Sequence, residues 1–183
     1  MRVVFDIGAH QGTTFDYWLL KTKKFDGGRV FCFEPSPRSL PLLLQKAHQL
    51  RHRFNIVVCP FALTDYAGTV PFYQKKSDPC ADTIFGGNGD PGDIDCGYAL
   101  HVACLPLTGF MAHNTDSEDE LHLKIDAEGV EYDILDDLLR RPDLLKRVKE
   151  LRVEFHPVQP EERQHRLRRQ FAEAGCAITE WGF

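Results

Sequence analysis

Short apolar runs alternate with helix-like segments along most of this 183-residue chain, and this alternation constrains the fold most strongly. The runs are rich in Val, Ile and Phe and are too short for helices. Strands are expected at 2–7, 29–35, 54–58, 101–107, 121–126, 150–156 and 177–183, and helices at 13–24, 37–52, 131–141 and 161–175. Buried strands separated by helices predict an α/β fold, a doubly wound, mostly parallel sheet with helices on both faces.

The middle of the chain departs from this alternation. Residues 68–73 could form one arm of a short hairpin, and residues 74–98 are rich in Gly, Asp and Pro with little to bury. Loops of this length are usually functional or disordered. We therefore expect one domain over residues 1–183, in which the 74–98 loop lies on the substrate side and closes over a bound substrate.

Composition excludes several classes of function. A net charge of −5 argues against a nucleic-acid binder, which needs a basic face. No apolar run approaches the roughly 20 residues of a membrane span, and the first residues lack the layout of a signal peptide. The six cysteines are scattered without a C-x-x-C pair, which favours reduced thiols and a cytoplasmic location.

A glycine turn follows the first expected strand, in the segment "VFDIGAHQG". In doubly wound sheets, ligands bind at the carboxyl ends of the strands, and glycines there let the backbone approach them closely. The dinucleotide fingerprint G-x-G-x-x-G fails, because His10 replaces its second glycine and Gly12 comes early. Asp6, two residues before Gly8, would disfavour a pyrophosphate. It favours a cationic ligand such as S-adenosylmethionine, whose amino group it could meet directly or through water.

A second acid, Glu34, ends the second expected strand. It lies 22 residues after Gly12, close to the roughly 20 expected of a ribose-binding acid. Alone it could be a solvated strand end. Together with Asp6 and the glycine turn, it predicts an S-adenosylmethionine site with the ribose hydroxyls on Glu34.

Five segments, in this order, resemble the FkbM-type S-adenosylmethionine-dependent methyltransferases: "VFDIGAHQGTT", "VFCFEPSP", "CPFALTDYAGTVPFY", "LHLKIDAEGVEYDIL" and "ELRVEFH". The resemblance implies the Rossmann-like fold of class I methyltransferases and O-methylation of a hydroxyl on a sugar, glycan or glycosylated natural product. The cofactor residues that it implies are Asp6, Gly8, Ala9, His10, Gly12, Glu34, Ala62 and Leu63.

The chain departs from the family pattern in three places. His10 replaces the usual Asn, Thr108 stands where an Asp is common, and the sheet is shortened at both ends. A shortened sheet leaves an edge that a second copy or a neighbouring domain could complete.

Methyl transfer to a hydroxyl needs the two reactants aligned and the proton removed. Asp126 and Glu128, two residues apart after the fourth strand of the alternation, could accept this proton or position the hydroxyl for His156 or a bound cation. Lys124 alternates with Asp126 and points the same way, although it could simply pair with either acid. His156 could be a base near neutral pH or a surface histidine. Asp126 could instead cap the following helix.

Carboxylates at these strand ends could also bind a divalent cation. Two other functions stay open at this point. A nicotinamide-dependent oxidoreductase would share the fold and the ribose acid but has no use for Asp6. A catalytically silent module would bind the cofactor without turnover.

Overall fold

The computed structural model describes residues 1–76, 82–84 and 100–182, so most of the expected 74–98 loop lies outside the described residues. The strands are β1 (Arg2–Ile7), β2 (Arg29–Phe33), β3 (Asn55–Cys59), β4 (Ala62–Thr64), β5 (Gly68–Phe72), β6 (Leu100–Pro106), β7 (Glu120–Ile125), β8 (Val148–Val153) and β9 (Ile178–Glu180). The helices are α1 (Thr13–Tyr17), the 3₁₀ turn η1 (Leu19–Lys21), α2 (Leu40–Leu50), α3 (Leu107–Asn114), α4 (Glu131–Leu139), α5 (Pro142–Leu145) and α6 (Glu161–Glu173).

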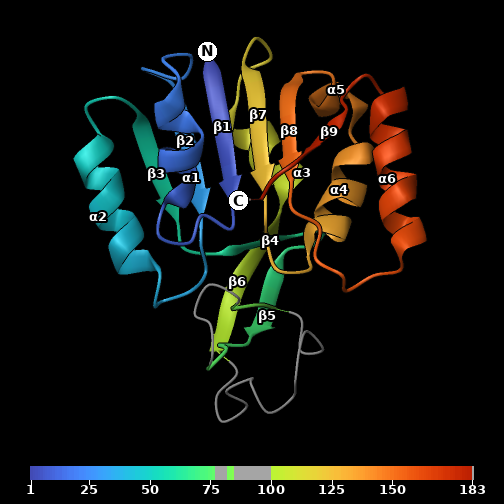
Figure 1. The fold of residues 1–183 in the computed structure, drawn as a ribbon, viewed down its shortest axis with the longest axis horizontal. Coiled ribbons are helices and arrows are strands. Elements are labelled where there is room, and N and C mark those ends of the chain that lie inside the picture. The colour runs from blue at the N-terminus through green and yellow to red at the C-terminus, as the bar shows by residue number, and fades with distance from the viewer. Residues whose placement is uncertain (77–81, 85–99, 183) are drawn as a thin grey trace.

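Six parallel strands form the main sheet in the order β3-β2-β1-β7-β8-β9, which confirms the expected α/β fold (Figure 1). From β1, the chain adds β2 and β3 on one side of the sheet and later β7, β8 and β9 on the other side. Ile7 at the end of β1 lies level with Phe33 of β2 and with Ile125 of β7. The segments that follow these three strands therefore leave the sheet at one edge, which is where such sheets bind ligands.

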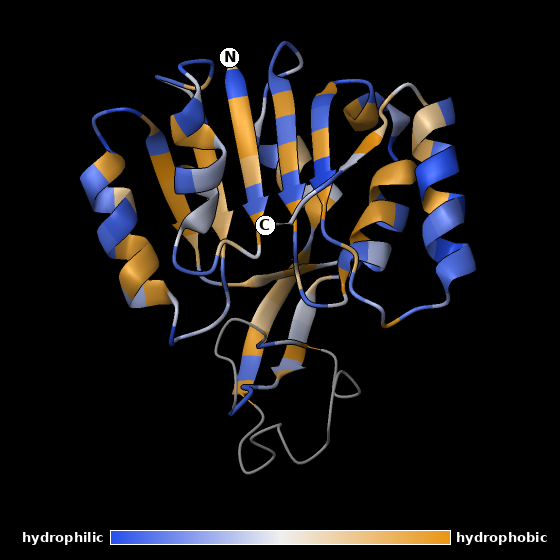
Figure 2. Cartoon of the chain, viewed as in Figure 1, coloured by the Kyte–Doolittle hydropathy of each residue, from blue (hydrophilic) through white to orange (hydrophobic). Residues whose placement is uncertain are grey.

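Hydrophobic side chains alternate across the sheet and bury both of its faces. Val4 and Val30 pack with α1, η1 and α2 on one face, whereas Phe5 and Phe31 pack with α3 to α6 on the other. Figure 2 shows hydrophobic residues along most of these strands. Burial on both faces explains the near-continuous apolar runs in the sequence.

A second, three-stranded sheet with the order β4-β6-β5 lies beyond the carboxyl ends of the main strands (Figure 1). The expected hairpin arm is β5, and it pairs antiparallel with β6. Strand β4 was not expected from the sequence. It pairs in parallel with β6 and so holds the small sheet next to the ligand-binding edge.

Two helical expectations were wrong. The helix expected at 13–24 ends at Tyr17, because Trp18 leaves helical geometry (φ −128°) and packs edge-on against Phe25, 5.2 Å between ring centroids. Helix α3 was not expected, and it begins at Leu107, the last residue of the strand expected at 101–107. Its eight residues include Thr108 and Gly109, which are weak helix formers, so no helix was predicted there.

Four cysteines of the described residues, Cys32, Cys59, Cys104 and Cys176, are buried free thiols. Within the same residues, no helix combines the length and the apolar character that a membrane span requires.

The turn after β1 requires a glycine at position 8 because a larger residue would clash with the backbone of Asp126. Gly8 has φ +72°, and a Cβ atom there would lie 1.7 Å from the carbonyl oxygen of Asp126. Gly27 has a similar φ of +75° but no atom within 4 Å of such a Cβ. Gly27→Ala should therefore cost only the conformational strain, about 1–2 kcal/mol. Gly8→Ala adds the clash with backbone and should cost at least about 3 kcal/mol more, measured by urea unfolding. Equal losses in the two variants would contradict this close packing.

Candidate active site

A cavity of about 300 Å³ opens where the main sheet meets the small sheet. Its walls come from the segments that follow β1, β2, β7 and β8, from β4 and from residues 82–84. Seven of the residues expected from the sequence line it: Gly8, His10, Glu34, Ala62, Leu63, Asp126 and Glu128. Asp6, Ala9, Gly12, Lys124 and His156 are not among the lining residues.

Glu34 binds the glycine turn to the end of β2. Its side chain accepts hydrogen bonds from the backbone N–H groups of His10 and Ser36, each at 2.7 Å. Burial raises the pKa of Glu34 to about 7, although these two hydrogen bonds lower it. A carboxylate has about four acceptor positions, so each oxygen can still accept a bond from a ligand in the cavity.

Two serines near Glu34 were missed in the sequence. Ser39 is 1% exposed, lines the cavity, and its Oγ has no hydrogen-bond partner among the described residues. Ser36 donates through Oγ to Asp82 at 2.8 Å and so brings residues 82–84 to the cavity wall. No sequence signal distinguishes them, since serine is common after a strand.

Asp6 lies outside the cavity, contrary to the expectation that it meets the ligand. Its carboxylate is fully buried, accepts a hydrogen bond from Thr14 at 2.9 Å and lies 3.4 Å from the Lys124 ammonium. Lys124 also contacts Asp126 at 3.2 Å and donates to the carbonyl of Gly8 at 2.6 Å. Burial lowers the pKa of Lys124, but Asp6 and Asp126 outweigh it and raise the pKa, so the ammonium stays charged. Lys124 is therefore a positioning residue that shapes the turn and holds Asp126.

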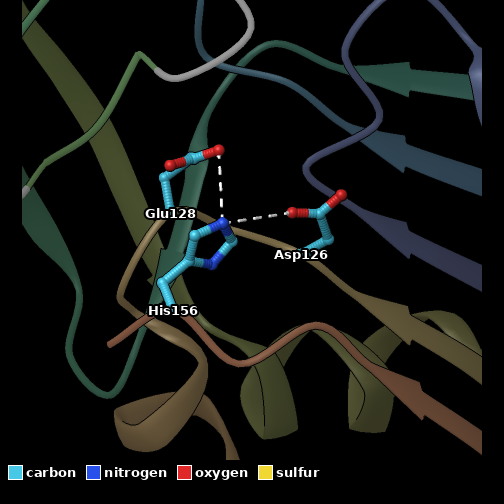
Figure 3. A group of neighbouring side chains, drawn as sticks. All are labelled: Asp126, Glu128 and His156. Atoms are coloured by element: carbon cyan, nitrogen blue, oxygen red, sulfur yellow. Dashed lines mark ion pairs between the residues drawn. The ribbon is translucent and has the colours of Figure 1, made fainter. Parts of the chain in front are cut away.

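His156 contacts three carboxylates at the end of β8, of which Figure 3 shows Asp126 and Glu128. Its Nε2 lies 3.3 Å from Glu128 and 4.0 Å from Asp126, and its Nδ1 lies 2.8 Å from Glu131. Burial lowers the pKa of His156, but the hydrogen bonds to Glu128 and Glu131 outweigh it and raise the pKa to about 10. The ring is therefore cationic at neutral pH, which argues against the alternative that His156 is a base near neutral pH.

Glu131 is a further residue that the sequence did not single out. It is fully buried and accepts hydrogen bonds from the backbone N–H groups of Ala127 and Gly129, at 2.8 and 3.0–3.1 Å. The capping alternative for Asp126 was also wrong, because the N-cap of α4 is Val130.

Backbone strain accompanies this cluster. Glu128 has φ +52°, which is rare for a residue with a side chain and costs of order 1–3 kcal/mol. Thr83 donates a 2.7 Å hydrogen bond to the carbonyl of Glu128 and so supports this conformation. Such strain is concentrated at functional sites, and here it presents the carboxylate of Glu128 to the cavity.

The all-parallel main sheet, the helices on both of its faces and the cavity at the carboxyl ends of its strands define a Rossmann-like domain. The chain matches the family model of the Methyltransferase FkbM domain over residues 6–182. The protein therefore belongs to the FkbM methyltransferase family, which confirms the resemblance and implies S-adenosylmethionine as the methyl donor.

One similar solved structure is the crystal structure of Methyltransferase FkbM from Methylobacillus flagellatus KT. It is 19% identical with a TM-score of 0.49, and the match covers 80% of this chain and 31% of that chain. This chain thus spans about a third of that protein's length. Among curated proteins, no sequence matches this chain.

Removing the Lys124 ammonium should leave Asp6 buried without its counter-charge. Lys124→Met is therefore expected to cost about 3–5 kcal/mol in the free energy of unfolding. The double variant with Asp6→Asn should recover part of that loss, because the uncompensated charge is gone. The control is Lys46→Met, which breaks an ion pair with Asp16 at the surface and should cost under about 1 kcal/mol. A loss as small as the control's would contradict the proposed role of Lys124.

Proposed function

We propose that this domain is an S-adenosylmethionine-dependent O-methyltransferase that acts on a hydroxyl of a sugar, glycan or glycosylated natural product. The observation that carries the proposal is a single cavity with a ribose-type carboxylate, Glu34, at one end. The carboxylates of Asp126, Glu128 and Glu154 also line it and follow β7 and β8, on the other side of β1 from β2 in the sheet, which makes this the acceptor end. One end suits the cofactor and the other suits a hydroxyl-rich acceptor.

The described residues fit the cofactor. Glu34 has acceptor positions left for both ribose hydroxyls, and the Ser39 hydroxyl is buried without a partner among the described residues. Phe61, Ala62 and Leu63 supply an apolar wall for the adenine. The backbone from Gly8 to His10 would lie along the methionine part. Bound there, S-adenosylmethionine supplies a methyl group already activated on a sulfonium.

The acceptor end has the groups to orient a hydroxyl and to take its proton. Asp126 is held by Lys124 and Glu128 by His156, so both carboxylates have fixed positions and serve to orient the hydroxyl. Glu154 also lines the cavity, and burial together with the nearby Asp126 raises its pKa. A carboxylate with a raised pKa is the better proton acceptor, which makes Glu154 the candidate base.

Affinity for S-adenosylhomocysteine should depend on pH through Glu34. Because the pKa of Glu34 is about 7, a change from pH 8 to pH 6 protonates the carboxylate and should weaken binding by about tenfold. Glu34→Gln should bind at least tenfold more weakly at pH 8 and lose this dependence. Ser39→Ala, the matched control, should lose one hydrogen bond, about 0.5–1.5 kcal/mol, and keep the dependence. Calorimetry at both pH values measures these affinities. Unchanged affinity in Glu34→Gln would contradict the assignment of Glu34 as the residue that binds the ribose.

Formation of S-adenosylhomocysteine over a panel of sugars, amines and carboxylic acids tests the reaction itself. We expect turnover with hydroxyl acceptors, and a loss of about 10²–10⁴ in kcat in Glu154→Gln with cofactor affinity retained. Cofactor binding without turnover on any sugar, or turnover on amines alone, would overturn the proposal.

A further inference from the structure

Three potential metal ligands converge from two strands at the acceptor end of the cavity. Asp126 and Glu128 follow β7 and His156 follows β8 (Figure 3). One ligand atom from each side chain lies within 4.8 Å of the others. We propose that Asp126, Glu128 and His156 bind one divalent cation of the Mn²⁺ type.

The distances suit a shared ion. His156 Nε2 lies 3.3 Å from Glu128 Oε1 and 4.0 Å from Asp126 Oδ1. An octahedral ion with bonds of about 2.1 Å places its ligand atoms about 3 Å apart in neighbouring positions and about 4.2 Å apart across the ion. A small movement of the carboxylates therefore completes the coordination. Two carboxylates and one imidazole favour Mn²⁺ over the softer metals, which prefer thiolates.

Outer residues orient each ligand in the way that metal sites require. Metal-binding histidines usually donate their other ring N–H to a carboxylate. Here Nδ1 of His156 faces the fully buried Glu131, and Nε2 faces Asp126 and Glu128. In Asp126, Oδ2 contacts Lys124 at 3.2 Å and Oδ1 faces His156. Glu131 and Lys124, which are not among the three proposed ligands, therefore hold two of those ligands in place.

A surface pair in the same protein lacks this support. His165 and Glu161 on α6 lie 3.3 Å apart, the same separation as His156 and Glu128, but their side chains are 70% and 79% exposed. The side chains of the cluster are only 18–24% exposed and are held by buried groups. A close His–Glu contact alone does not make a metal site, and this pair supplies a matched control.

The surrounding charge also favours a cation. Glu131 and Glu154 add negative charge near the three ligands, whereas Lys124 is the only lysine or arginine that contacts them among the described residues. The role of the ion rests on the proposed function: it would polarise the acceptor hydroxyl so that the proton leaves more readily.

Binding of Mn²⁺ can be measured by the loss of its free-ion EPR signal on addition of metal-stripped protein. The unchanged protein and the control, Glu161→Gln with His165→Gln, should bind one ion with equal affinity. Glu128→Gln with His156→Gln should bind at least tenfold more weakly, and so should Asp126→Asn, a smaller change that preserves the shape of the site. Circular dichroism and S-adenosylhomocysteine affinity show whether each variant is folded.

Failure to bind Mn²⁺ at millimolar concentration, or equal binding by the site variants, would overturn the proposal. The proton on His156 would then hold the carboxylates together. Methyl transfer before and after metal removal separates this inference from the proposed function. Mn²⁺ binding without methyl transfer leaves the metal site standing and removes the proposed O-methyltransferase activity. If the protein transfers the methyl group but neither binds Mn²⁺ nor needs it for activity, only the proposed metal site is removed.

Discussion

The buried ammonium of Lys124 connects the three parts on which the site depends. It pairs with Asp6 inside the sheet, donates to the carbonyl of Gly8 in the turn after β1, and contacts Asp126 after β7. A charge that is 1% exposed is costly unless it is paired and hydrogen-bonded, and each of these contacts offsets part of that cost. The turn and the acceptor-side acid are thereby held at a set distance from one another.

Pairing of partly buried charges also determines the arrangement at the acceptor end of the cavity. His156 is surrounded by Asp126, Glu128 and Glu131, and this surplus of carboxylates gives the ring a positive charge in the ion-free protein. In the proposed function the acids orient the hydroxyl and Glu154 is the candidate base, because it lines the cavity and forms no salt bridge among the described residues. A metal ion would take the place of the proton on His156.

Much of the architecture follows from local pattern. Strands buried on both faces produce continuous apolar runs, and β1, β2, β7 and β8 could be placed because their Val, Ile, Leu and Phe content leaves little ambiguity. The three-residue β4 and the weakly helical α3 could not, since each is stabilised by its neighbours more than by its own residues. The end of α1 could not be predicted either, because it depends on the contact of Trp18 with Phe25, seven residues further along the chain.

The sequence by itself determined the alternation of buried strands and helices that builds the main sheet, the glycine turn, and the acids Glu34, Asp126 and Glu128 at the carboxyl ends of its strands, because these depend on residue type and spacing. Only the tertiary structure decided what each charged group does. Asp6 and Lys124 are partners in the interior, Glu131 is a buried support and His156 is a cation, because burial and the nearest charge set the protonation and direction of a side chain. Asp6 and Lys124, for example, lie on neighbouring strands but are more than a hundred residues apart in the sequence, so no local sequence pattern indicates their contact.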